Sequence, residues 1–194
     1  MNPMIDQKKT APHLIDPNLP ISIQNTFLKY DDLNPSEKAL HDELKEFYSN
    51  NNYIEDILQP LNTENHRLSL RLINWVVTNY VRVQGVRYAV NDIMVDIHAN
   101  YQSQLNHWKK NLFDPFRRNR RFLWPLSDGE YMITTLSQLN FFRWCIQYHV
   151  LNFILAHQQE MEAEMKKHEK KTICKSNWAC TYHIPISISV ISNT

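Results

Sequence analysis

The sequence predicts a mainly α-helical protein with a single domain. Glycine is scarce, with only Gly85 and Gly129 in 194 residues, whereas all-β sandwiches and barrels use many glycines in tight turns. Hydrophobic residues make up 43% of the chain, enough for one core without disulfides. We therefore expect about four main helices around a long central helix, with an extended arm at residues 1–33, a helical domain at 34–171 and a tail at 172–194.

The arm and the first helix are separated by a capping signal. Four prolines lie within residues 1–33, so this segment is expected to be extended and without secondary structure of its own. Asn34 can cap the first helix, Pro35 suits the first helical position, and Glu37 can reach back as in a capping box. Three asparagines from Asn50 end this helix.

Two further helices are predicted from apolar residues that recur every three or four positions. The second runs from about residue 64 to 82, and Gly85 follows where a C-terminal glycine is expected. The third runs from about residue 91 to 112. It ends before Asp114-Pro115, because the residue before proline avoids the α region.

The central helix is predicted to begin at Thr135, which has capping-box spacing with Gln138, and to continue to about Lys171. Its first half, to Ala156, is apolar nearly all round, as expected of a helix at the centre of a domain. Its second half is charged and is expected to be an exposed extension.

Two short strands are also indicated. Residues 131–133 form one candidate, and residues 184–190 alternate isoleucine or valine with serine or proline, which is strand periodicity. A lone strand needs a partner edge. The tail strand would find it either at residues 131–133 or in another molecule.

Charge is segregated along the chain although the net charge is only +1. Residues 1–65 carry −6, residues 66–125 carry +7, residues 126–165 carry −4 and residues 166–194 carry +4. No global field therefore indicates nucleic acid or a membrane, but the basic middle contains a connector, residues 116–122, that concentrates arginine beside aromatic rings.

This connector is the leading candidate site. Arginine can bind phosphate through two hydrogen bonds, and aromatic faces can stack on bases. The alternative interpretation is an arginine-rich loop that pairs with the acidic front half or is simply solvated. The candidate residues for binding nucleic acid or another polyanion are Lys109, Lys110, Arg117, Arg118, Arg120, Arg121 and Trp124.

Metal and catalytic candidates are weaker. A zinc site could use His168, Cys174, Cys180 and His183, but five residues separate the cysteines instead of the usual two to four, so free thiols and surface histidines compete with it. Asp92 and Asp96, one helical turn apart, with His98 nearby, resemble a metal-dependent nuclease pattern or a solvated helix face. His149 is interpreted as a core histidine. We expect no catalytic residue and no cofactor.

Compartment signals indicate an intracellular protein. The first ten residues lack the apolar core of a signal peptide, and three cysteines suit a reducing compartment. The apolar stretch at 136–156 contains arginine, glutamine, histidine and asparagine, which are costly in a bilayer, so no membrane span is expected. Oligomeric state is not indicated.

Three segments resemble a family of uncharacterised proteins of nucleocytoplasmic large DNA viruses: LRLINWVVTNY at 70–80, FDPFRR at 113–118 and TTLSQLNFFRW at 134–144. The resemblance covers about residues 65–170 and carries no activity. It implies a place in an infected cell or a virion. Twenty asparagines against seven alanines are compatible with an AT-rich genome.

These observations favour a non-enzymatic viral protein that binds nucleic acid or an acidic protein surface through the arginine connector. The alternative is a structural or assembly protein of a virion or capsid, in which the arm and the tail strand contact other viral proteins. A third hypothesis is a metal-dependent nuclease or a zinc-stabilised factor.

Overall fold

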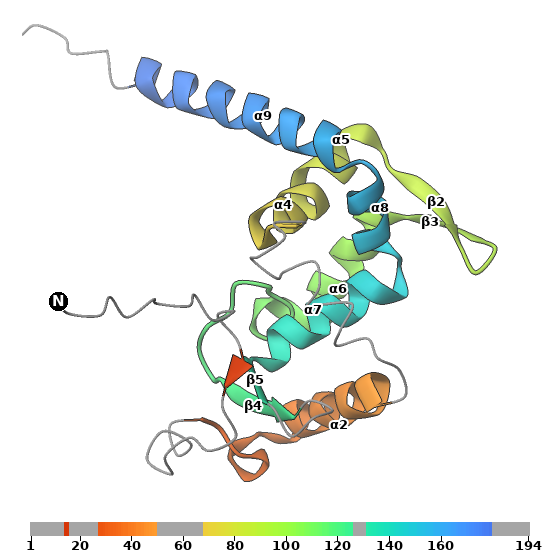
Figure 1. The fold of residues 1–194 in the computed structure, drawn as a ribbon, viewed down its shortest axis with the longest axis vertical. Coiled ribbons are helices and arrows are strands. Elements are labelled where there is room, and N and C mark those ends of the chain that lie inside the picture. Colours follow the sequence, from red (N-terminus) through yellow and green to blue (C-terminus); the bar gives the residue numbers. More distant parts are fainter. Residues whose placement is uncertain (1–13, 16–26, 50–67, 126–130, 180–194) are drawn as a thin grey trace, which may run out of the picture.

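The computed structural model describes residues 14–15, 27–49, 68–125 and 131–179, and within them the mainly α prediction is confirmed. Two small antiparallel sheets accompany the helices (Figure 1). The helices are α2 (Pro35–Ser49), α4 (Leu70–Trp75), the π-helical η2 (Val76–Tyr80), α5 (Val81–Gln84), α6 (Ile97–Leu112), α7 (Leu136–Gln147), α8 (Val150–Ala156) and α9 (Gln158–Ala179). The strands are β1 (Leu14–Ile15), β2 (Arg87–Val90), β3 (Ile93–Asp96), β4 (Phe122–Pro125) and β5 (Tyr131–Thr134).

Helix α2 begins with the predicted capping box. The Asn34 side chain accepts a hydrogen bond from the Glu37 amide at 3.0 Å, and the Glu37 carboxylate accepts one from the Asn34 amide at 3.1 Å. The buried side chains of Leu40, Leu44 and Tyr48 face α7. The Tyr48 hydroxyl also donates to the Leu139 carbonyl at 2.8 Å, which fixes α2 on the N-terminal half of α7.

The second helix begins later than the predicted residue 64. It begins at Leu70, because Ser69 caps it by accepting a 3.1 Å hydrogen bond from the Leu72 amide. It continues through η2 and α5, and Gly85 closes it in the left-handed region with a φ of 61°, as the sequence predicted.

The prediction of a helix from residue 91 is wrong, because residues 87–96 form a β-hairpin. Strands β2 and β3 pair antiparallel around a two-residue turn, in which Asn91 and Asp92 have φ angles of 50° and 63°. Such turns favour asparagine and aspartate, which tolerate positive φ. Helix α6 begins only at Ile97, where the Asp96 side chain accepts from the Ala99 amide at 2.9 Å.

The long central helix is broken into three. Residues 148–149 interrupt it with His149 in the left-handed region, at a φ of 52°, and His157 interrupts it again. The first segment, α7, lies between α2 and α6 at the centre of the fold (Figure 1), as predicted for an apolar helix. The last segment, α9, projects from the body and continues to Ala179, beyond the predicted end at Lys171.

The three-stranded sheet has the order β1–β5–β4. The predicted strand at 131–133 is confirmed as β5, and both of its edges are occupied, by β1 and β4. It therefore offers no edge to the predicted strand at 184–190, which lies outside the described residues. Strand β1 and a 3₁₀ turn at Tyr30–Asp32 also give the arm secondary structure that was not predicted.

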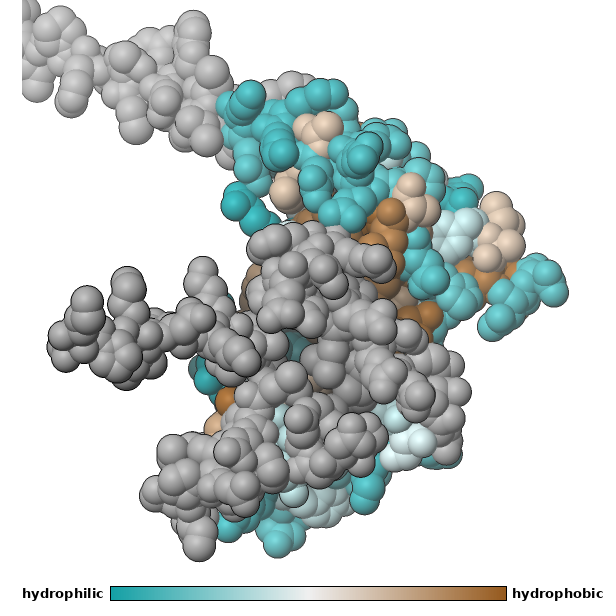
Figure 2. Space-filling view, viewed as in Figure 1, coloured by the Kyte–Doolittle hydropathy of each residue, from teal (hydrophilic) through white to brown (hydrophobic). Residues whose placement is uncertain are grey.

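The visible face of α9 is hydrophilic in the space-filling view, as predicted for an exposed extension (Figure 2). Brown, hydrophobic atoms gather between this helix and the β2–β3 hairpin. Within the ranges described above, no helix has both the length and the apolar character to cross a membrane.

Candidate polyanion-binding groove

The connector between α6 and β4 is held by the N-terminal turn of α7. The Asp114 amide donates to the Ser137 hydroxyl at 2.7 Å, and that hydroxyl donates to the Asp114 carbonyl at 3.2 Å. The Gln138 side-chain amide donates to the Pro115 carbonyl at 3.0 Å. These bonds fix the backbone that carries the predicted arginines. The roles of Ser137 and Gln138 in holding the connector were not predicted from the sequence.

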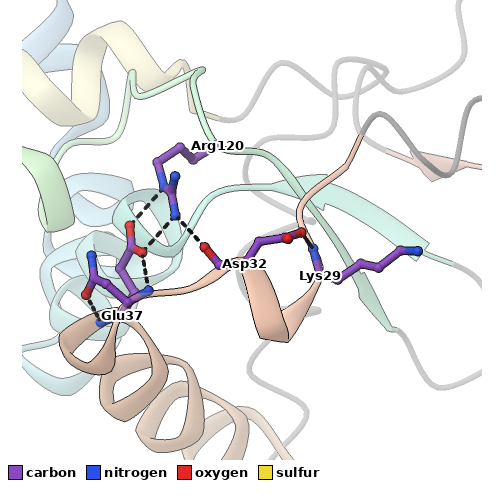
Figure 3. Close-up of polar contacts among 5 residues, drawn as sticks. Lys29, Asp32, Glu37 and Arg120 are labelled. Carbon is purple, nitrogen blue, oxygen red and sulfur yellow. Dashed lines mark hydrogen bonds and ion pairs between the residues drawn. The ribbon is translucent and has the colours of Figure 1, made fainter.

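Arg120 is bound to the acidic front half of the chain, as the alternative interpretation of the connector expected. Its Nε and Nη2 atoms donate to the two Glu37 carboxylate oxygens at 2.9 and 2.8 Å (Figure 3). Nη2 also donates to the Asp32 carbonyl at 3.2 Å. The Glu37 side chain is only 11% exposed, so this ion pair leaves Arg120 little capacity for an external anion.

Arg120 adopts a left-handed backbone conformation, with a φ of 60°. This conformation is unfavourable for a residue with a β-carbon, and the three hydrogen bonds of its side chain hold it there. The next residue, Arg121, is also fixed through its backbone, because its carbonyl accepts from the Leu28 amide at 2.8 Å. This bond joins the end of the arm to the connector.

Three other arginines line a groove of about 350 Å³ that we call the arginine groove. It is formed by Leu70, Pro115, Phe116, Arg117, Arg118, Arg121, Ile133, Thr134 and Gln138. None of these residues is acidic. Among the residues that the structure describes, no carboxylate pairs with any of the three guanidinium groups. Arg117 donates to the neutral Asn111 side chain at 3.0 Å, and Arg121 donates to the Arg118 carbonyl at 3.0 Å.

The remaining predicted cations do not join this groove. Lys109 lines a second groove, of about 580 Å³, together with Arg117 and Arg120, but Asp32 and Glu37 line it too. Lys110 is exposed on α6 outside both grooves. Of these two grooves, Arg118 and Arg121 therefore line only the one whose described lining contains no acidic residue, whereas Lys109 and Arg120 line only the one that contains carboxylates. Arg117 lines both grooves.

The structure removes Trp124 from the candidate binding residues. Trp124 is 5% exposed, and its ring packs 5.5 Å from the His41 ring and 6.1 Å from the Tyr48 ring, measured between centroids. Phe122, two positions earlier on β4, is buried on the same side of the strand. All four residues of β4 are apolar or proline in the sequence, so the alternation of buried side chains became apparent only in the structure. Phe116 is the exposed ring of the connector, at 43%.

The aspartates of the nuclease candidate do not come together. Asp96 caps α6 and pairs with Arg87 at 3.1 Å, while Asp92 lies in the hairpin turn, so the two aspartates do not share a helix face. The Ala99 amide, which donates to the Asp96 carboxylate, is the largest cause of that group's lowered pKa. Across the described ranges, no three histidine, cysteine, aspartate or glutamate side chains converge as for a metal ion.

Two of the four zinc candidates lie beyond the residues that the structure describes. His168 is on α9, with its ring 6.1 Å from the Trp75 ring. Cys174 lies in the same helix, while Cys180 and His183 fall outside the described residues. His149, interpreted from the sequence as a core histidine, is instead exposed at the α7–α8 break.

Comparison with known proteins places the chain among viral sequences. A family model described as "Family of unknown function (DUF7197)" matches residues 25–188. The chain is 28% identical over 166 residues to the uncharacterized protein L507 of Acanthamoeba polyphaga mimivirus. The match covers 80% of this chain but only 64% of the mimivirus protein. No solved structure matches the chain. The predicted resemblance to uncharacterised proteins of large DNA viruses is confirmed.

Proposed function

Because the chain belongs to DUF7197, a family of unknown function, we propose a function from its own surface: it is a non-enzymatic binding protein that contacts nucleic acid through the arginine groove. The observation that carries this proposal is that Arg117, Arg118 and Arg121 line a groove in which none of the described lining residues is acidic. The neighbouring Arg120 has a carboxylate partner, whereas these three guanidinium groups have none among the described residues.

The chemistry of guanidinium groups supports a phosphate ligand. Each presents several N–H donors in a planar fork that matches two phosphate oxygens. The connector is also held rigidly, at Asp114, Pro115 and Arg120. A rigid site loses less conformational entropy when it binds. An exposed aromatic ring, Phe116, stands beside the arginines, a combination found in nucleic-acid sites and not required for an acidic protein surface.

The test is binding of a fluorescently labelled oligonucleotide, followed by anisotropy at several salt concentrations. The double variant Arg118→Ala/Arg121→Ala should weaken binding and flatten its salt dependence. Each lost phosphate contact should lower the slope of log affinity against log salt by ~0.7 for a single strand or ~0.9 for a duplex. The matched control is Arg82→Ala, which removes one exposed positive charge from α5, far from β4 (Figure 1).

Two results would contradict the proposal. The first is binding that does not depend on salt. The second is an equal loss of affinity in Arg82→Ala and in the single variant Arg118→Ala, which would show that only net charge matters. Preference for a polyglutamate probe over an oligonucleotide would instead identify an acidic protein surface as the partner.

The assembly hypothesis gains no specific support from the described residues. The part of the arm that the structure describes pairs within the chain, where Leu14 and Ile15 lie opposite Met132 and Tyr131. The tail strand on which the same hypothesis depends lies outside the described residues. We therefore retain nucleic-acid binding as the proposed function.

A further inference from the structure

Phe116 is a phenyl ring exposed at the edge of the arginine groove. Its backbone is fixed, because its amide donates to the Asp114 side chain at 2.8 Å and the following amide, of Arg117, donates to the Asp114 carbonyl at 3.2 Å. A single exposed apolar residue is ordinary on a protein surface. Here, however, the ring is carried on a fixed backbone beside three cations, and among the described residues that line this groove it is the only aromatic one.

The lining of the groove combines two kinds of surface. Leu70, Pro115 and Ile133 are apolar and extend the surface of the Phe116 ring, whereas the arginines supply positive charge. The volume of about 350 Å³ is at the lower end of the ~300–1,000 Å³ of small-ligand sites. A nucleotide has the matching pair of surfaces, because its base is flat and weakly polar and its phosphate is anionic.

A duplex does not present a base face for this ring, because each base is already stacked on its neighbours. Unpaired bases are free to stack on an aromatic side chain, and such stacking is the common device of single-strand binding. The polar groups of the groove are engaged with the protein: Gln138 donates to the Pro115 carbonyl and accepts from Thr134 at 3.4 Å. They offer little for distinguishing one base from another.

We infer that the arginine groove binds single-stranded nucleic acid without base specificity, with one unstacked base on the Phe116 ring and the flanking phosphates on Arg118 and Arg121. This inference rests on the proposed function and specifies its ligand. In this inference Phe116 distinguishes single strands from duplexes. The arginines bind the phosphates, which single strands and duplexes have in common.

The experiment compares four probes of similar length or charge: oligo-dT, the duplex of oligo-dT with oligo-dA, inorganic polyphosphate and polyglutamate. Phe116→Ala should weaken oligo-dT binding by about tenfold, which corresponds to ~1.4 kcal/mol and lies within the range for one stacked base. Polyphosphate binding should not change, because it involves no base. Phe116→Tyr should keep the affinity for oligo-dT, while Phe116→Leu, which retains an apolar side chain without a ring, should behave like Phe116→Ala.

The outcomes separate the inference from the proposed function. If Phe116→Ala binds oligo-dT as the unaltered protein does, while Arg118→Ala/Arg121→Ala loses binding, the inference is wrong and the proposed function stands. Equal affinity for duplex and single strand, or a Phe116→Leu variant that binds normally, also overturns it. If removing the arginines changes nothing, the proposed function fails and the inference fails with it. Polyglutamate bound more tightly than oligo-dT refutes both.

Discussion

Replacing Arg120 with alanine is expected to destabilise the protein by about 2 kcal/mol. The substitution removes two hydrogen bonds to Glu37 and one to the Asp32 carbonyl. A hydrogen bond to a charged group contributes ~1.5–3 kcal/mol, and breaking a fully buried ion pair costs ~3–5 kcal/mol. The Arg120 side chain is 43% exposed, so water can replace part of the lost hydrogen bonding. The expected destabilisation is therefore smaller than that of breaking a fully buried ion pair.

The assay is reversible urea unfolding with a double-mutant cycle. Arg120→Ala, Glu37→Gln and the double variant should give a coupling energy of ~1–2 kcal/mol, and Arg120→Ala should lower the melting temperature by roughly 4–8 °C. Arg118→Ala is the matched control, because its side chain is exposed and has no ion pair among the described residues. It should change stability by no more than ~0.5 kcal/mol.

The reasoning would be refuted if the two single substitutions added without coupling. It would also be refuted if Arg120→Ala destabilised the protein no more than Arg118→Ala did. In either case Arg120 would be solvated like its neighbours, and it would have to be counted among the cations available to an external ligand.

Three further predictions concern other parts of the fold. His149→Gly should raise stability by ~1 kcal/mol in thermal unfolding, because glycine adopts the left-handed conformation without steric cost, whereas His149→Ala should not. Burial and the hydrogen bond to Glu160 raise the pKa of Tyr80 to about 12 from 10.0. The stability contributed by the protonated Tyr80 hydroxyl is therefore present below pH 10 and lost as the pH rises to about 12. Tyr80→Phe should reduce this decline in alkaline unfolding curves. Leu44→Ala should cost ~2–5 kcal/mol by urea unfolding, since Leu44 is fully buried; a smaller loss would show that the contact between α2 and α7 is loosely packed.

Local chemistry explains which helix ends could be predicted from the sequence. The capping residues Asn34 and Thr135 act within four positions of the helices they begin, and Gly85 ends its helix through its own φ angle. Each signal depends only on neighbouring residues. It therefore holds whatever the rest of the fold does.

The predicted helix boundaries were wrong where two local structures fit the same residues, or where the residue that breaks the helix is not one that usually does so. Ile93 and Ile97 have helical spacing, but the Asn91-Asp92 turn makes the first a strand residue. The left-handed His149 has no sequence signature comparable to glycine.

The candidate site was predictable in composition but not in electrostatics. The connector sequence identified the arginines, but the pairing of Arg120 depends on Glu37, 83 positions earlier. No local pattern distinguishes Arg120 from Arg118 or Arg121. Only the fold shows that Arg120 has a carboxylate partner, whereas Arg118 and Arg121 line a groove whose described residues include no acid.

The long separation between α2 and its partner helix has a consequence for synthesis on the ribosome. Tyr48 bonds to Leu139, 91 positions later, and at ~5–20 residues per second this interval takes roughly 5–20 s to translate. Throughout that time the apolar face of α2 lacks the helix that buries it in the finished fold. The nascent chain is therefore most exposed to aggregation just before α7 emerges, and a pause in translation upstream of Leu139 would prolong this state.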